Sequence, residues 1–574
     1  MDTRKSHILF TLSIAILLLL GGAALAVASG DSLYRNAAFG FTANYKYPAC
    51  QETNIKNVIV LVPDGCSQSV QTLSRWYSGK PLQVDEMIAG TVSTYSADSV
   101  ITDSSSAATA FATGYKTTNG FISVGPAGNS VLSTLEPPSE ELQYCPLATV
   151  LEGSRFEGKA TGLVATVRVS HATPAAFASH VDNRDNENEI MEQMVYGDID
   201  VVFGGGSRHL LPLAEGGKRT DGENLTTVLL ERDYQLVDSR DEMLALESGK
   251  TWGLFSSTHM ASAINRPYLA PDQPTLVEMT GKAIELLSQD KDGFFLMVEG
   301  SQIDGANHAN DPIYAVTGFL AFDEAVKVAV DFAEKDGHTL VLVFPDHNTG
   351  GMTIGSYSDP EYESTTVEDV IGPLKGMKLN SIGVASKIGN DLSSDNIKAQ
   401  LKTWWDIDAT DDDVTEILEL YDNGNGIELY YAISEVISRN HTVIGWTTHG
   451  HTGEDVPLWA YGPGHPTGYI DNTEIAGCIA EELGFDLKES NSCLFVEVGE
   501  FFSKDNGDGH LDENGYLLDM TDPSNPVLKI GDSELPVSKD LLIKDGVTHE
   551  LEGIVVYAPV TDRVYVPAEV LSLV

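Results

Sequence analysis

Residues 56–63, KNVIVLVP, form an unbroken apolar run that is rich in β-branched side chains and ends directly before Asp64 and Gly65. Such a run is typical of a strand buried on both faces of a parallel sheet. Similar short runs recur at 159–167, 200–203, 293–298, 338–344 and 458–461. Asp64 is expected at the carboxyl end of its strand, where open α/β sheets bind ligands, so this edge of the sheet is the candidate functional region.

Helical patterns lie between the apolar runs. Residues 276–288 and 313–333 carry apolar side chains at spacings of three and four, with Glu and Lys interleaved. Strands that alternate with amphipathic helices predict an α/β fold, a three-layer α/β/α sandwich around a large, mostly parallel central sheet. We assign residues 45–354 and 441–487 to this domain.

Two further segments depart from the alternating pattern. Residues 355–440 contain acid-rich helical stretches such as 408–421 and no comparably apolar strand, which predicts a helical insertion within the domain. Residues 488–574 show alternating apolar and polar positions with turn signals, as at 553–559 and 563–567. They predict a small β-rich C-terminal appendage.

The N-terminal residues 1–28 have the pattern of a secretory signal peptide, with Arg4 and Lys5 before an apolar run and small residues at its end. Because the run spans 8–28, an uncleaved membrane anchor is the alternative. Either reading predicts an exported protein, extracellular or in the cell envelope. Of the five cysteines at least one has no partner within the chain, and Cys66 is the candidate.

The chain is strongly acidic, with 84 Asp and Glu against 35 Lys and Arg and a formal net charge of −49. This charge argues against nucleic acid or an anionic membrane surface as a partner held by long-range attraction. The excess is spread along the chain, which is typical of a heavily solvated surface. A pocket for an anionic substrate must therefore carry its own cations.

Residues 102–114, TDSSSAATAFATG, place three serines after an Asp and before a run of good helix formers. A helix that starts after Asp103 would put Ser104 at its N-terminus, where free N–H groups and the helix dipole favour an alkoxide or a bound anion. Locally, a plain capped helix explains the pattern as well. The nucleophile hypothesis depends on the rest of the site.

Carboxylates and imidazoles gather just beyond or before several predicted strands. Mixed oxygen and nitrogen ligands of this kind are typical of catalytic zinc sites that keep one position open. Two or three cations close together can clamp a phosphoryl group. The candidate ligands are Asp64, Glu299, Asp304, His308, Asp346, His347 and His451.

Six motifs occur in the order and context in which they stand in alkaline phosphatases. The resemblance extends over roughly residues 56–484 and identifies 45–354 and 441–487 as an alkaline phosphatase-like catalytic domain. The motifs are VPDG at 62–65, TDSSSAATAFATG at 102–114, HATPAAFASHVDNR at 171–184, VEGSQIDGANH at 298–308, PDH at 345–347 and HTGEDVPLWAYGP at 451–463.

The resemblance implies two zinc ions and a third metal, usually magnesium. It implies Asp304, His308 and His451 as ligands of the first zinc, and Asp64, Asp346 and His347 as ligands of the second. Asp64, Thr173 and Glu299 would hold the third metal, with His171 beside it.

The resemblance also implies the reaction. The enzyme would hydrolyse phosphate monoesters to an alcohol and inorganic phosphate through a phosphoserine at Ser104. Arg184 would bind two phosphate oxygens, and Asp103 would steady Arg184. A phosphodiesterase or nucleotide pyrophosphatase of the same superfamily and a non-catalytic exported phosphate-binding protein are the alternatives. Members of the family are commonly dimeric, so a homodimer is an open expectation.

Two positions depart from the family pattern. His171 stands where well-known bacterial members have an Asp, and imidazole favours a softer third metal than magnesium. We therefore expect the third site to bind magnesium weakly or to prefer another divalent ion. Gly305 stands where that group has a Lys, so we expect weaker phosphate binding and faster product release.

Overall fold

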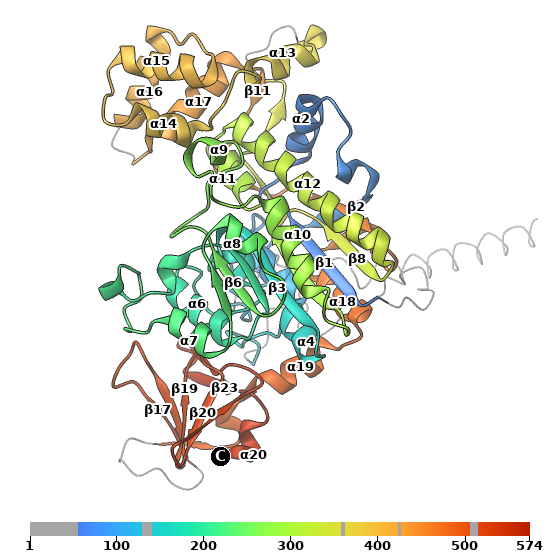
Figure 1. The fold of residues 1–574 in the computed structure, drawn as a ribbon, viewed down its shortest axis with the longest axis vertical. Helices are drawn as coiled ribbons and strands as arrows, with labels where there is room; N and C mark the ends of the chain where they lie inside the picture. The colour runs from blue at the N-terminus through green and yellow to red at the C-terminus, as the bar shows by residue number, and fades with distance from the viewer. Residues whose placement is uncertain (1–54, 129–140, 358–361, 423–425, 506–514) are drawn as a thin grey trace, which may run out of the picture.

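The computed structural model describes residues 55–128, 141–357, 362–422, 426–505 and 515–574 (Figure 1). Within these residues a ten-stranded sheet forms the centre of the molecule. Every neighbouring pair is parallel except those of β13, which is antiparallel to β2 and β8. Across the sheet the strands run β14 (Gly468–Asp471), β2 (Ile88–Ser93), β13 (Val456–Tyr461), β8 (Thr339–Val343), β1 (Asn57–Val62), β7 (Phe294–Glu299), β3 (Ala160–Arg168), β4 (Val201–Gly205), β6 (Thr251–Leu254) and β5 (Gln235–Val237).

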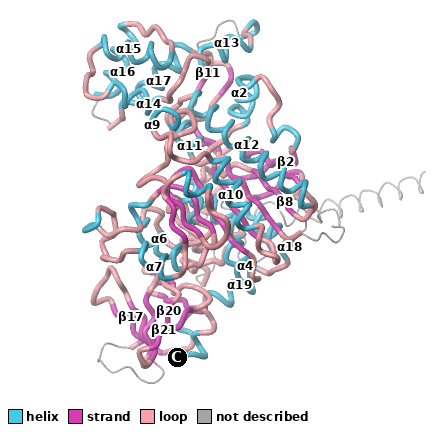
Figure 2. The backbone as a smooth tube through the Cα atoms, viewed as in Figure 1, coloured by secondary structure: helices cyan, strands magenta, loops and turns pink. Residues whose placement is uncertain are grey.

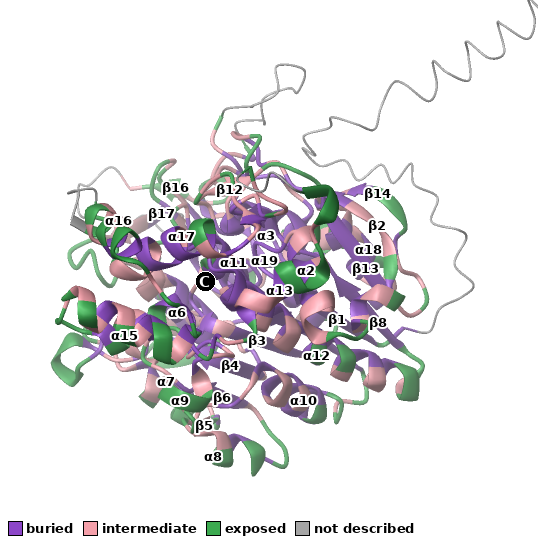
Figure 3. Cartoon of the chain, turned by 90° about the horizontal axis from the view of Figure 1, so that it is seen from above, coloured by how far each residue is buried: buried purple, intermediate pink, exposed green. Residues whose placement is uncertain are grey.

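Both faces of the sheet are buried, which confirms the predicted three-layer sandwich. In β1, Ile59 and Leu61 contribute to one apolar cluster, while Val58 and Val60 contribute to the cluster on the opposite face. This alternation explains why the strand reads as a continuous apolar run. Figure 3 shows the central strands drawn as buried, with exposed residues on the surrounding helices.

Helices cover the two faces separately (Figure 2). One cluster includes residues of α2 (Gln68–Ser78), α10 (Leu276–Leu287) and α12 (Pro312–Asp336). The other includes residues of α3 (Ser104–Thr113), α4 (Val150–Phe156), α6 (Glu187–Tyr196) and α18 (Thr473–Leu483). The predicted helices at 276–288 and 313–333 correspond to α10 and α12.

Local signals fix the ends of the longest helix. The side chain of Asp311 caps α12 by accepting a hydrogen bond from the backbone N–H of Tyr314 at 3.1 Å, and Pro312 occupies the first helical position. Gly337 ends the helix with a φ of 73°. Because a side chain is strained in that conformation, glycine is the favoured residue there.

The acid-rich segment folds as helices at one end of the molecule, at the top of Figure 1. They are α13 (Val367–Ile371), α14 (Ser381–Ile388), α15 (Ser394–Trp405), α16 (Asp411–Asp422) and α17 (Leu429–His441). A two-stranded ladder of β10 (Thr353–Ile354) and β11 (Ile444–Gly445) brings its two ends together. The name "insertion" is kept below for residues 355–440, whose boundaries stay a prediction.

The C-terminal region is β-rich, as predicted, and lies at the opposite end of the molecule (Figure 1). It has a small core of its own. Arg232 of the larger part of the chain and Asp540 of this region form a bidentate ion pair, with the shorter contact at 2.5 Å. Its six-stranded sheet has the order β16 (Ser503–Lys504), β17 (Gly515–Asp519), β18 (Val527–Ile530), β19 (Ser533–Pro536), β20 (Leu541–Lys544) and β21 (Val547–Glu550), and its three-stranded sheet has the order β15 (Val496–Glu497), β23 (Arg563–Val566) and β22 (Val556–Ala558).

The predictions for the N-terminal segment and for one cysteine cannot be compared with the structure. The proposed signal peptide or anchor at 1–28 and Cys50 lie outside the described residues. Of the helices that are described, none combines the length and apolar character needed to cross a membrane. The described cysteines, Cys66, Cys145, Cys478 and Cys493, form no disulfide with one another, so the structure does not single out Cys66. Cys66 is buried, and burial raises the pKa of its thiol well above its usual value.

Candidate active site

Three neighbouring parallel strands place the first acidic groups of the site. Strand β1 lies between β8 and β7, so the residues that follow these strands emerge side by side at one edge of the sheet. Asp64 follows β1, Asp346 follows β8, and Glu299 is the last residue of β7. The backbone N–H of Gly65 donates to Asp346 Oδ1 at 3.0 Å and ties two of these loops together.

Two groups of three candidate metal ligands form at this edge. In each group the ligand atoms lie within 4.8 Å of one another. Helix α11 (Gln302–His308) supplies two members of the first group, and the antiparallel pairing of β12 (His451–Thr452) with β9 (Asn348–Thr349) brings in the third. The first trio is Asp304, His308 and His451, and the second trio is Asp64, Asp346 and His347.

The two trios differ in burial. All members of the second trio are buried, whereas all members of the first are partly exposed. In the second trio, Asp64 Oδ1 and Asp346 Oδ2 are buried and make no hydrogen bond with the described residues, although His347 Nε2 lies 3.7 Å and 3.0 Å from them. Two buried carboxylates that share one imidazole are disfavoured unless a cation compensates their charge. This set of two carboxylate oxygens and one imidazole nitrogen therefore fits a bound metal ion.

The carboxylates of the site perturb one another and the imidazoles beside them. Against the effect of burial, neighbouring carboxylates raise the pKa of His347 and raise that of His308 to about 9. Burial and the nearby charges of Asp346, Asp304 and Glu299 raise the pKa of Asp64 well above its usual value. Burial also raises the pKa of Glu299 to about 7. Burial and the neighbouring His347 lower the pKa of His451 to about 4, so its ring is neutral and can act as a ligand. A divalent cation would relieve the repulsion among the carboxylates.

Ser104 is the first residue of α3 and is buried. The side chain of Asp103 caps this helix by accepting a hydrogen bond from the backbone N–H of Ser106 at 2.9 Å. Ser104 Oγ lies 3.2 Å from Nε2 of His347, a member of the second trio. The helix begins where the sequence predicted, and its N-terminus faces the buried trio.

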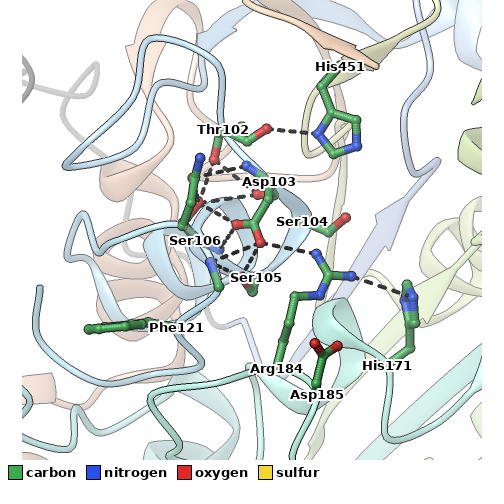
Figure 4. A network of polar contacts seen from close by, with 12 residues as sticks. Thr102, Asp103, Ser104, Ser105, Ser106, Phe121, His171, Arg184, Asp185 and His451 are labelled. Carbon is green, nitrogen blue, oxygen red and sulfur yellow. Dashed lines mark hydrogen bonds and ion pairs between the residues drawn. The ribbon is translucent and has the colours of Figure 1, made fainter. Parts of the chain in front are cut away.

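Arg184 lies on the other side of the nucleophile candidate (Figure 4). Its NH1 group contacts Asp103 Oδ2 at 3.1 Å, and its backbone N–H donates to the carbonyl of Gly120 at 2.8 Å. Asp103 also accepts from the backbone N–H of Gly120 at 3.0 Å. The loop around Gly120 thus holds both members of the Asp103–Arg184 pair.

The ligands expected for the third metal are Asp64, Thr173 and Glu299, and they do not form one of the two trios. Thr173 of α5 (Ala172–Ala175) and Glu299 each present a buried side-chain oxygen without a hydrogen-bond partner in the described residues. His171 precedes α5, and its Nε2 lies 3.5 Å from NH2 of Arg184 while Nδ1 is buried and unpartnered. Burial and the charge of Arg184 lower the pKa of His171 well below its usual value. The ring is therefore neutral, and it lies beside the guanidinium group of Arg184 (Figure 4).

Two glycines shape the site in opposite ways. Gly65 has a φ of 67°, and a Cβ there would lie 2.8 Å from Cα of Asp304, so this turn excludes a side chain. At Gly305 an added Cβ would meet only the hydroxyl of Tyr314 at 3.9 Å. Position 305 thus has room for a side chain and the sequence supplies none.

Three residues beside the trios were not predicted. Thr349 donates its hydroxyl to Asp304 Oδ1 at 2.6 Å. His449 Nδ1 contacts the carbonyl oxygen of His308, and Glu435 Oε2 lies 3.1 Å from His449 Nε2. The sequence could have indicated His449, because it lies only two residues before the predicted ligand His451. Glu435 lies within the acid-rich insertion, where no local pattern distinguishes it.

Carboxylate and imidazole clusters at the edge of a parallel sheet, with a serine at a helix N-terminus between them and an arginine, define a metal-dependent hydrolase. A family model narrows this class. The model described as alkaline phosphatase matches residues 55–485, and the chain belongs to this family. The protein is accordingly a phosphatase, and its family is metal-dependent.

Known proteins agree with this assignment. Alkaline phosphatase 3 of Bacillus subtilis is 38% identical over 458 residues, which cover 76% of this chain and 91% of that protein. The crystal structure of Thermus thermophilus alkaline phosphatase is similar with a TM-score of 0.68 and 26% identity, over 76% of this chain and 95% of that one. A His-to-Asp variant of TAB5 alkaline phosphatase with Mg bound in its M3 site is similar with a TM-score of 0.53 and 25% identity, over 75% of this chain and 99% of that one.

Proposed function

We propose that this phosphatase hydrolyses phosphate monoesters through a phosphoserine at Ser104, with one zinc ion at each trio and a third divalent metal nearby. The observation that carries the proposal is the position of Ser104 Oγ, 3.2 Å from His347 Nε2 at the N-terminus of α3. No other serine of the 102–114 stretch is placed in this way. Ser105 Oγ and Ser106 Oγ instead donate to the carboxylate of Asp103 at 2.6 and 2.8 Å.

Zinc held by the two trios would act as a Lewis acid that lowers the pKa of the Ser104 hydroxyl and of a water molecule and neutralises charge on the leaving oxygen. The residues present fit zinc, because each trio combines carboxylate oxygen with imidazole nitrogen. The partly exposed first trio leaves room for a substrate atom. The buried second trio surrounds the nucleophile side of the site.

The chain's own residues account for binding and orientation. In the first step the bond from Ser104 Oγ to phosphorus forms as the ester oxygen leaves and takes up a proton. In the second step water attacks the phosphoserine from the opposite side, and Ser104 recovers its proton. Arg184, held by Asp103 at 3.1 Å, can offer two parallel N–H donors to the phosphoryl oxygens in both steps.

The third metal is part of the same proposal. Asp64, Thr173 and Glu299 would hold it, and magnesium is the family's usual ion. His171 is the feature of this chain that argues for weak magnesium binding, because its nitrogen replaces a hard carboxylate oxygen. The TAB5 variant with Mg bound carries an Asp in place of a His, which supports a role for this exchange in magnesium binding.

The experiment is hydrolysis of a phosphate monoester at alkaline pH, with and without a chelator, for the wild type and Ser104→Ala. Chelation should abolish activity, and the variant should lose about 10⁴-fold in kcat or more. Labelling with radioactive phosphate at acidic pH should mark the wild type and not the variant. Activity that survives chelation would overturn the mechanism, and preference for a diester would favour the phosphodiesterase alternative.

Localisation and assembly are further parts of the proposal. Residues 1–28 support export to the extracellular space or the cell envelope, with cleavage after Ala26 or Ala28 or retention as an anchor. The N-terminal sequence and mass of protein recovered from medium and membranes distinguish these outcomes. Sedimentation of the purified enzyme tests the homodimer.

A further inference from the structure

The insertion returns to the active site through α17. Ser434 of this helix donates its hydroxyl to the carbonyl of Ala309 at 2.5 Å. Ala309 directly follows His308 at the end of α11. The backbone N–H of Ser381, in α14 of the insertion, donates to Asp311 Oδ2 at 2.7 Å, two residues further on. The insertion therefore contacts the segment that carries two members of the first trio.

His308 and His449 hold each other by reciprocal contacts. His449 Nδ1 donates to the carbonyl oxygen of His308 at 2.7 Å, and His308 Nδ1 contacts the carbonyl oxygen of His449. A carbonyl oxygen only accepts, so Nδ1 of His308 carries a proton. Nε2 then faces Asp304 Oδ2 and His451 Nε2, each 3.2 Å away, and is the nitrogen left to bind a metal ion.

The position of His449 is in turn fixed by the insertion. Its Nε2 lies 3.1 Å from Glu435 Oε2, and the ring of Tyr431 packs edge-on against it with centroids 5.8 Å apart. Both contacts come from α17. The side chain of His449 is 44% accessible, so its ring is held by these two contacts together with the contact from Nδ1 to the carbonyl of His308.

We propose that Glu435 is a positioning residue for the first metal, acting through His449 to hold His308 in its ligand orientation. Outer partners of metal-bound histidines fix ring orientation, and their loss typically lowers metal affinity about 10- to 100-fold. The inference rests on the proposed function, because it takes the first trio to be a zinc site. It assigns to the helical insertion a part in metal retention.

The test compares zinc affinity of full-length wild type, Glu435→Ala and Glu416→Ala by competition with a chromophoric chelator. Glu416 is the matched control, because it shares the partner Arg439 with Glu435, at 2.8 and 3.4 Å, while its other described partner is Asn440 rather than His449. In Glu435→Ala we expect one zinc equivalent to be held about 10- to 100-fold more weakly and the other unchanged. Glu416→Ala should match the wild type.

Two further measurements separate positioning from general damage. Added zinc should restore activity in Glu435→Ala, and Glu435→Gln, which keeps an acceptor for His449, should recover most of the affinity. Equal weakening of both zinc equivalents, or wild-type affinity in Glu435→Ala, would overturn the proposal. If Glu435→Ala does not fold, His449→Ala takes its place with the same expectation, because it breaks the same link to His308. A wild type that binds no zinc would instead refute the proposed function.

Discussion

The pair of Asp103 and Arg184 gives the sharpest prediction about substrate binding. We consider Asp103→Asn, which removes the charge and keeps one oxygen. That oxygen can still cap α3 through the N–H of Ser106, and Asn is as good a capping residue as Asp. The new amide nitrogen can take the place of Oδ2, which in the wild type accepts from Arg184, from the N–H of Gly120 and from the hydroxyl of Ser105. The hydroxyl can turn to accept, but the N–H groups of Gly120 and Arg184 then face another donor, and Arg184 loses its anchor.

The size of the effect follows from the ordering of one long side chain. Immobilising such a side chain at a binding interface costs about 0.5–1.5 kcal/mol. In the wild type Asp103 orders Arg184 before phosphate binds, whereas in the variant phosphate must order it, so the free energy of phosphate binding becomes less favourable by this amount. At about 1.36 kcal/mol for each factor of ten, the expected loss in affinity is about 2- to 13-fold. Both partners are partly exposed, with side-chain accessibilities of 19% and 23%, so the direct Coulomb contribution is small.

The assay is competitive inhibition by inorganic phosphate during hydrolysis of a phosphate monoester. The inhibition constant should rise about 2- to 13-fold in Asp103→Asn, with the melting temperature close to that of the wild type. Asp103→Ala should in addition lose about 1 kcal/mol of stability, because it removes the cap.

Asp185→Asn is the control for the charge change. Asp185 follows Arg184 directly and is exposed (Figure 4). In the part of the chain that the structure describes, the ion pair of Arg184 is made to Asp103. An unchanged inhibition constant in Asp103→Asn, or an equal rise in Asp185→Asn, would refute the reasoning.

Three other predictions concern single side chains. His171→Asp should bind magnesium about 10-fold more tightly than the wild type in titrations of metal-free enzyme followed by activity, and micromolar saturation of the wild type would contradict this. Gly305→Lys, at a position with room for a side chain, should lower the inhibition constant of phosphate about 5-fold, and no tightening would contradict the role given to the missing lysine. Glu189 has a pKa raised to about 7 by burial and by Glu192 and Asp182, so its protonated form is favoured in the folded state and stability falls as pH rises from about 4.5 to 7. Glu189→Gln should therefore raise the free energy of unfolding by on the order of 1 kcal/mol at pH 8 and leave it unchanged near pH 4, and an equal gain at both pH values would contradict the assignment.

Most of the central sheet could be predicted because its strands are buried on both faces and read as continuous apolar runs. Strand β2, Ile88–Ser93, was missed because it is only partly buried and its sequence, IAGTVS, contains small residues and an exposed Ile88. The edge strands β5 and β14 are short and largely exposed, so their sequences also lack the apolar signal. Strand β6, Thr251–Leu254, was missed although it is buried throughout, because its four residues, TWGL, are too few for an apolar run. Burial on both faces thus made a strand visible only where the strand had an apolar run.

The sequence predicted which residues make up the two trios, but it did not predict how buried each trio is. The motifs that carry Asp64 and Asp346 indicate ligands, yet nothing in them shows that one trio is buried and the other open. The orientation of His171 toward Arg184 was equally invisible, because it depends on a fold that brings two loops together. Glu435 is one acid among many in the insertion, and only tertiary contacts distinguish it.

The difference in burial between the trios suits the two halves of the proposed reaction. The buried trio next to Ser104 excludes bulk water from the nucleophile, and in such surroundings the interactions of a phosphoryl group with cations are strongest. The partly exposed trio lies where an alcohol of any size must leave and where water must enter. An open site loses metal more readily than a closed one unless its ligands are held from outside. The contacts of α17 with His449 and Ala309 fall on this open side, where such support is needed.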